Sequence, residues 1–146
     1  MSFLLSLLLV FGWPLAPASV VRGFEPPPAP WLAGHRGVDL AGPPGAPVLA
    51  AGAGAVVFAG RIAGRGIVSV AHALGVRTTY EPISAVVVVG DLVASGQQIG
   101  TLAAGHPGCA VQACLHWGAR RGTDYLDPLS LLGRGRVRLL PLNSPP

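Results

Sequence analysis

Two short segments, about eighty residues apart, contain side chains that can bind a metal ion. His35 and Asp39 lie four positions apart in the glycine-containing segment 34–39, and His116 lies in the segment Cys114–Gly118. Residues two or four apart on an extended strand point to the same face, so His35 and Asp39 could meet a histidine on a second strand. Two imidazoles and a carboxylate are a usual ligand set for a catalytic zinc, whose fourth position holds water. The spacing therefore predicts a zinc site formed by His35, Asp39 and His116.

Other roles for these residues remain open on the sequence alone. His35 could be a turn histidine that hydrogen-bonds to Asp39 without a metal, and His116 beside Trp117 could be a core histidine. If Cys114 supplied a fourth ligand, the site would be closed and structural rather than catalytic.

The elements that must position these residues are short strands. Strand-like runs rich in Val, Ile and Ala occur at 48–51, 55–59, 67–71, 76–81, 83–89, 92–94, 99–103 and 113–119. No segment after residue 18 has sustained helical periodicity, and 127–132 is the best candidate for a helical turn, with Asp127 as its N-cap. The pattern predicts an all-β fold, a small antiparallel β-sandwich or barrel-like domain.

The first eighteen residues have the features of a secretory signal. An apolar run, Met1–Phe11, is followed by Ala16-Pro17-Ala18, which matches the small-x-small pattern read by signal peptidase. We expect cleavage after Ala18 and a secreted, extracytoplasmic protein associated with the cell envelope. A short uncleaved anchor is the alternative. The expected organisation is a signal peptide at 1–18, a proline-rich lead-in at 19–33, a β domain at 34–140 and a tail at 141–146.

Composition excludes some classes of protein. Hydrophobic residues make up 51% of the chain and charged residues 11%, so a buried core is expected in spite of 21 glycines and 15 prolines. The net charge of +4 favours an anionic surface such as a cell envelope. Nucleic-acid binding is not expected, because most arginines are scattered; Arg134, Arg136 and Arg138 alternate and predict the solvent face of a last strand.

Cys109 and Cys114 are the only cysteines of the chain. In an exported protein such a pair is first interpreted as a disulfide. Two free thiols, one of them near the metal, are the alternative.

Several segments together resemble the lysostaphin-like (LytM-type) zinc endopeptidases of peptidoglycan. They are Gly34–Asp39, Pro47–Val56, Gly75–Tyr80, Val89–Gly100 and Leu115–Gly118, in the order and spacing of that family, and the likeness extends from about residue 31 to residue 132. The resemblance implies an antiparallel β fold with an open groove and zinc ligands at His35, Asp39 and His116. It also implies hydrolysis of peptide bonds in the stem peptides or cross-bridges of the cell wall, with no stable membrane insertion after signal cleavage.

The chain departs from the family at two catalytic positions, which suggests a divergent exported branch. The family has a His-x-His whose first histidine assists catalysis, and Cys114 stands there; it also has a Tyr-x-His, and Pro82 stands at that histidine. His106 and Glu81 are candidate substitute bases, and Glu81 would need a bulge to reach the site. Tyr80 could donate to an oxyanion. His72 is the weakest candidate and is better explained by packing.

These departures leave three functions to compare. The first is a zinc metallopeptidase acting on peptidoglycan. The second is a catalytically silent peptidoglycan-binding or regulatory homologue that keeps the metal site, and the third is a structural envelope protein without a metal.

Overall fold

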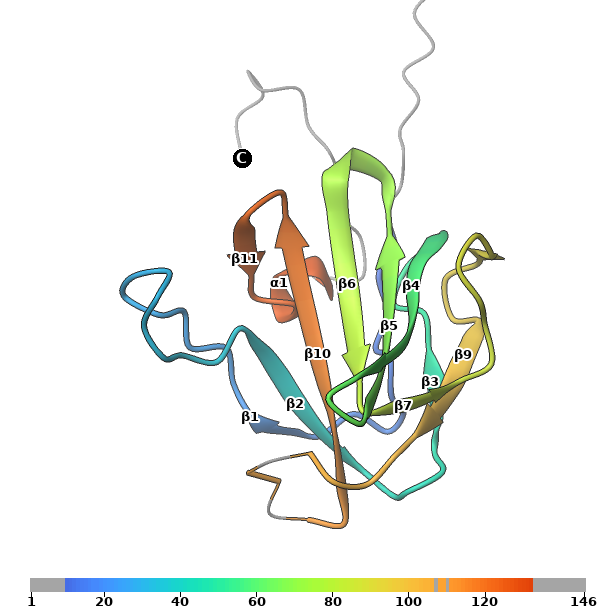
Figure 1. Ribbon diagram of the computed structural model, residues 1–146, viewed down its shortest axis with the longest axis horizontal. Helices are drawn as coiled ribbons and strands as arrows, with labels where there is room; N and C mark the ends of the chain where they lie inside the picture. The colour runs from blue at the N-terminus through green and yellow to red at the C-terminus, as the bar shows by residue number, and fades with distance from the viewer. Residues whose placement is uncertain (1–9, 107, 110, 133–146) are drawn as a thin grey trace, which may run out of the picture.

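The computed structural model describes residues 10–106, 108–109 and 111–132, and it is built almost entirely from strands (Figure 1). The strands are β1 (Val20–Arg22), β2 (Gly37–Gly42), β3 (Pro47–Leu49), β4 (Gly54–Ile62), β5 (Arg65–Ala71), β6 (Val76–Glu81), β7 (Ile83–Ala85), β8 (Leu92–Val93), β9 (Gln98–Leu102), β10 (Ala113–Arg121) and β11 (Asp124–Leu126). A 3-10 turn, η1 (Ala73–Gly75), joins β5 to β6, and a short helix, α1 (Leu129–Leu132), follows β11. The predicted all-β class is confirmed.

The strands form two antiparallel sheets. The larger sheet has eight strands in the order β1-β2-β10-β6-β5-β4-β8, with β11 paired to β10. The smaller sheet has three strands in the order β3-β9-β7 and lies on the right in Figure 1. The crossover that brings β10 between β2 and β6 places residues from both ends of the sequence side by side.

The register of the three central strands separates core from site. Val38, Trp117 and Tyr80 are aligned across β2, β10 and β6, and all three are fully buried. Because successive side chains alternate between the two faces of a sheet, their neighbours Asp39, His116 and Glu81 form a second row on the other face. The core therefore fixes the orientation of the row that could do chemistry.

The segment before β1 is part of the packed domain. Phe11 and Leu15 are 2% and 1% exposed, and both belong to the hydrophobic core. The backbone of this segment pairs with the domain, since Gly12 N–H donates to Ala51 O at 2.7 Å. Residues 1–9 lie outside the described residues, and cleavage after Ala18 stays a prediction, although it would remove two core side chains.

Most predicted elements correspond to observed ones, but the sequence did not predict β1 or β11, and one predicted strand is shorter than expected. The run 83–89 was expected to be one strand, but β7 ends at Ala85, and Val86 and Val88 are each 66% exposed in the turn that follows. The helical turn is confirmed, because Asp127 Oδ1 accepts a hydrogen bond from Leu129 N–H at 3.0 Å. The expected strand around Arg136 and the tail at 141–146 lie outside the described residues.

The part of the chain that the structure describes contains no helix long and apolar enough to cross a membrane.

Candidate metal centre

Four side chains from distant parts of the chain converge on one point. His35, Asp39, His106 and His116 each offer a nitrogen or oxygen atom, and these atoms lie within 4.8 Å of one another. The structure thus brings together the three predicted ligands and adds His106, which the sequence suggested only as a base.

The sheet itself places two of the four. Asp39 on β2 and His116 on β10 are directly opposite each other, and His116 Nδ1 lies 2.9 Å from Asp39 Oδ1. His35 precedes β2 and is fixed by a two-way backbone bridge to Glu25, with N–O distances of 2.9 and 2.7 Å. The bridge keeps His35 on the same face as Asp39, as the four-residue spacing predicted.

Gly37, between His35 and Asp39, makes room for the third ligand. A Cβ atom at this position would lie 2.5 Å from the Trp117 carbonyl oxygen and 2.8 Å from His116 Nε2. Any other residue would displace the imidazole or the strand that carries it. The sequence did not single out Gly37 as a functional residue, although a glycine between two ligands on one strand face was a usable signal.

The hydrogen bonding of His35 fits a metal ligand. Its Nδ1 lies 2.7 Å from the carbonyl oxygen of Gly23, which can only accept, so Nδ1 carries the proton. In the neutral imidazole, Nε2 then points an unprotonated lone pair at Asp39 Oδ1, 3.0 Å away. Two acceptors facing each other require a cation or a proton between them. A zinc-bound histidine usually donates its other ring N–H to a carboxylate, a backbone carbonyl or water, and this contact fixes the ring.

Asp39 is held as an anion at the centre of the group. Its side chain is 3% exposed, and it contacts three imidazoles. Burial alone would raise its pKa, but hydrogen bonds from His116 and His106 and the charges of His106 and His35 outweigh burial and lower the pKa to about 2. Histidine nitrogens and a carboxylate are the donors that zinc takes, at distances of roughly 2.0–2.2 Å. The donor set therefore fits a zinc ion.

His106 reaches the group from the loop before β10. Its Nε2 lies 3.0 Å from Asp39 Oδ2, and its side chain is 12% exposed. Its other nitrogen, Nδ1, is buried and has no hydrogen-bond partner among the described residues. The loop thus places His106 at the metal group, and its role as a substitute base stays a prediction.

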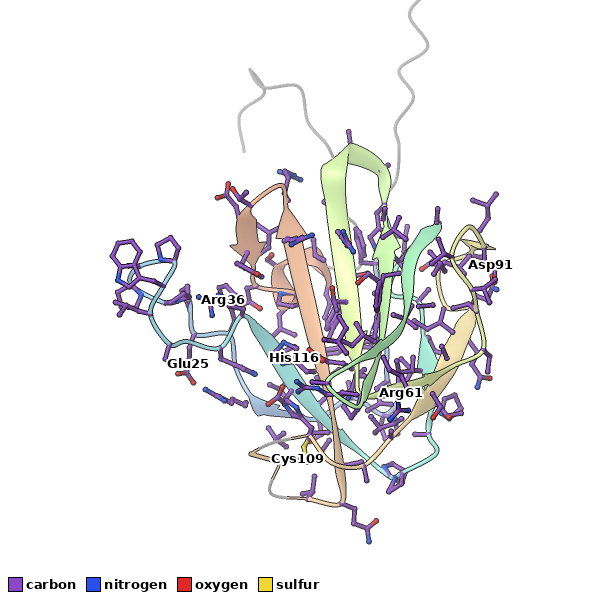
Figure 2. All side chains as sticks on the ribbon, in the orientation of Figure 1. Glu25, Arg36, Arg61, Asp91, Cys109 and His116 are labelled. Carbon is purple, nitrogen blue, oxygen red and sulfur yellow. A yellow bond between two sulfur atoms is a disulfide. The ribbon has the colours of Figure 1, made fainter. Side chains whose placement is uncertain are left out.

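The two cysteines are joined in a disulfide, with the Cα atoms 5.8 Å apart. Figure 2 shows Cys109 on the loop that leads to β10 and His116 on that strand. Because its sulfur is bonded to Cys109, Cys114 is not available as a thiolate ligand. The alternative of a site closed by Cys114 is therefore wrong for this structure.

Glu81 lies nearer to the site than the sequence suggested. It is paired directly with His116 across β6 and β10, so both side chains are on the same face without the bulge that we expected. Its Oε2 lies 3.4 Å from Arg65 Nε. We expected a bulge because we assumed that position 82 faces the site, which would turn Glu81 to the other face of the strand. The strand β6 ends at Glu81, before position 82.

Tyr80 does not face the site, in contrast to our expectation. It is fully buried on the core face of β6, and its hydroxyl accepts from Ala51 N–H at 2.9 Å and lies 2.7 Å from Thr78 Oγ1. Thr78 also contacts His72 Nε2 at 2.7 Å. Tyr80 and His72 thus form a buried polar network with Thr78, as expected for His72 and unlike the oxyanion role suggested for Tyr80.

A groove of about 400 Å³ begins at His116 and follows the sheet away from the metal group. Polar lining residues include Glu81, Thr79 and Ser69, and its walls include Phe58, Ile67 and Tyr125. Gly37 and Gly118 are paired next to His116 and leave this part of the sheet without side chains. The arrangement can place an extended chain beside the metal group.

Comparisons with known proteins agree with this geometry. The chain is 56% identical over 138 residues to the uncharacterized protein Rv2891 of Mycobacterium tuberculosis, covering 91% of this chain and 55% of Rv2891. It is 37% identical over 98 residues to the DD-carboxypeptidase/endopeptidase Mpg of Neisseria gonorrhoeae, covering 66% of this chain and 22% of Mpg. The chain thus spans about half the length of Rv2891 and less of Mpg.

Solved structures show the same fold. The antimicrobial peptidase lysostaphin from Staphylococcus simulans matches with a TM-score of 0.72 and 26% identity, over 87% of this chain and 55% of that one. A zinc-containing peptidase from Vibrio cholerae matches with a TM-score of 0.67 and 25% identity, over 80% and 38%. The family model for Peptidase family M23 matches residues 33–128, which include all four residues of the metal group. This chain belongs to Peptidase family M23.

Proposed function

We propose that the domain is a zinc metallopeptidase that hydrolyses peptide bonds in the peptidoglycan of the bacterial cell wall, outside the cytoplasm. The main support for this proposal is that His35, Asp39 and His116 converge at one end of an open groove. Peptidase M23 membership and the likeness to lysostaphin support the substrate class.

His35, Asp39 and His116 would hold the zinc. A zinc ion bound there would polarise the scissile carbonyl and lower the pKa of a bound water to about 7. The chain's own residues orient the ligands: the Gly23 carbonyl fixes the His35 ring, and Gly37 leaves space for the imidazole of His116.

His106 is the first candidate for the general base. Its Nε2 is the nitrogen that faces the metal group, 3.0 Å from Asp39 Oδ2, whereas Nδ1 is buried. Nε2 is therefore the nitrogen placed to take a proton from the attacking water. Glu81, across from His116, is the second candidate, and Arg65 holds its carboxylate at the groove edge.

A catalytically silent peptidoglycan binder is the second candidate function. One observation favours it: His106 Nε2 belongs to the convergent donor set, so four protein ligands are available and none of the four positions need hold water. In that case the site would stabilise a binding scaffold rather than activate a nucleophile.

Digestion of purified peptidoglycan, with released stem-peptide fragments measured by mass spectrometry, tests the proposal. We expect the wild type to release fragments, Asp39→Ala to release none, and the exposed-site control Glu25→Gln to match the wild type. Loss of the general base should lower turnover by about 10²–10⁴-fold in His106→Gln or in Glu81→Gln. Full turnover in both variants would exclude both as the base. Equal silence of the wild type and Asp39→Ala, with peptidoglycan still bound, would establish the binder instead.

A further inference from the structure

Two arginines face each other across the groove floor, away from the metal group. Arg77 on β6 and Arg120 on β10 are directly opposite in the register, both are half-buried, and both line the groove that begins at His116. Side chains directly opposite on paired strands have their Cβ atoms roughly 5 Å apart, and like charges at such positions destabilise a sheet.

No acidic side chain compensates this pair within the described part of the chain. The ion pairs that involve arginine there are Arg22–Glu25 and Arg65–Glu81, and neither includes Arg77 or Arg120. Partial burial, and then the charge of Arg120, lower the pKa of Arg77, as expected when two cations share one side of a groove. An anion between the two guanidinium groups would remove this repulsion.

A third arginine of the groove is held in place by other contacts. Arg36 donates to the carbonyl oxygens of Pro30 and Leu32 at 2.8 and 3.2 Å, and its guanidinium lies 5.5 Å from the centre of the Tyr125 ring. One of its terminal nitrogens, Nη2, is thus already engaged, whereas Arg77 and Arg120 line the groove and have no hydrogen bond or ion pair of this kind among the described residues.

The register also gives the distance between the pair and the metal group. His116, Gly118 and Arg120 lie on one face of β10, as do Glu81, Thr79 and Arg77 on β6. Four residues of strand separate His116 from Arg120, or ~13 Å, and an extended peptide covers that length with about four residues. A carboxypeptidase must instead bind the terminal carboxylate next to the scissile bond, so this spacing suits an endopeptidase.

We propose that Arg77 and Arg120 form an anion subsite that binds a carboxylate of the substrate peptide three to four residues from the bond to be cut. This inference rests on the proposed function, which identifies the bound peptide as a substrate. Binding of the peptide to the subsite does not itself require catalysis. Paired guanidinium groups suit a carboxylate because each can donate two parallel hydrogen bonds to it.

Binding of acidic and amidated peptides tests the subsite. The probes are stem peptides isolated from peptidoglycan, with free carboxylates or with all carboxylates converted to amides. They are titrated by calorimetry into the zinc-loaded wild type and, as a form that does not cleave them, into the metal-free variant Asp39→Ala. We expect the free acids to bind at least tenfold more tightly than the amides at low salt. The preference should fall below about twofold in Arg77→Gln and in Arg120→Gln.

The neighbouring Arg121→Gln is the matched control. Arg121 lies next to Arg120 on the same strand but points to the opposite face, so the substitution removes the same charge without touching the groove. It should keep the preference. Because each groove variant removes a repulsive partner, we also expect its melting temperature to equal or exceed that of the wild type.

Two results would overturn the subsite: equal affinity of acids and amides for the wild type, or equal loss of the preference in Arg121→Gln, which would indicate a general effect of net charge. Parallel digestion keeps the two proposals apart. Equal affinities with intact cleavage reject the subsite alone, whereas an arginine-dependent preference without cleavage supports the subsite and rejects the peptidase.

Discussion

At the scale of single residues, the metal group depends on small contacts as much as on the ligands. Asp39 Oδ1 lies 3.0 Å from His35 Nε2 and 2.9 Å from His116 Nδ1, and Gly37 keeps the space in which the second ring lies. That His35 and Asp39 lie on one face could be predicted from their spacing on an extended strand. The Gly23 carbonyl that orients His35 could not, because twelve residues and a turn separate it from the ring that it binds.

Substitution of Gly37 should damage the site without removing any ligand. We expect Gly37→Ala to weaken zinc affinity by at least tenfold, because its Cβ would displace the His116 imidazole or the backbone of β10. The control is Gly118→Ala on the paired strand, whose Cβ would meet nothing closer than 3.6 Å. Competition with a fluorescent chelator measures both affinities; similar values for both variants would contradict the role of Gly37.

At the scale of elements, side chains alternate between the two faces of β6, so neighbouring residues of one short motif serve the core and the groove. Tyr80 faces the core and Glu81 faces the groove, whereas the sequence suggested the reverse relation to the site. The error has a physical reason: the face of each residue depends on the partner strand, and the pairing of β6 with β10 joins segments about forty residues apart. Local elements, such as the turn capped by Asp127, were predictable because their hydrogen bonds are local.

The buried network around Tyr80 should make the fold sensitive to alkaline pH. Burial raises the pKa of Tyr80 to about 12 from 10.0, against smaller opposing effects of the hydrogen bonds to Thr78 and Ala51. Since the folded state favours the neutral phenol, its contribution to stability is complete below pH 10 and is lost as the pH rises through 12. The shift corresponds to roughly 3 kcal/mol.

Chemical denaturation at pH 8, 10 and 12 checks this prediction. We expect Tyr80→Phe to be about 1–3 kcal/mol less stable than the wild type at pH 8, because Ala51 N–H loses its buried acceptor. The variant should also show a weaker fall in the free energy of unfolding above pH 10. An identical fall in both proteins would assign the effect to another group.

At the scale of the whole molecule, the core extends into the segment that the sequence assigned to a signal peptide. Phe11 packs edge-on against His72, with ring centroids 5.0 Å apart, and its ring lies 2.8 Å from where a Cβ of Gly52 would be. An apolar segment followed by small residues suits both export and burial, so composition alone could not distinguish them.

Removal of the Phe11 side chain should therefore destabilise the domain. We expect Phe11→Ala to lower the free energy of unfolding by about 3–5 kcal/mol, the usual cost of truncating a buried aromatic ring. Val10→Ala, at a residue that is 46% exposed, should change it by about 0.5 kcal/mol or less. Equal stability of Phe11→Ala and the wild type would show that residues 10–18 do not belong to the core in solution.

We propose that His35, Asp39 and His116 together bind one zinc ion. The most direct measurement is the zinc content of the purified, dialysed protein by mass spectrometry, with the nitrogen and oxygen ligands determined by X-ray absorption spectroscopy. We expect one zinc per chain, bound by at least two imidazoles and a carboxylate, and none in a folded Asp39→Ala variant. A folded wild type without zinc after incubation with the ion, or an Asp39→Ala variant with the same zinc content, would rule out this site.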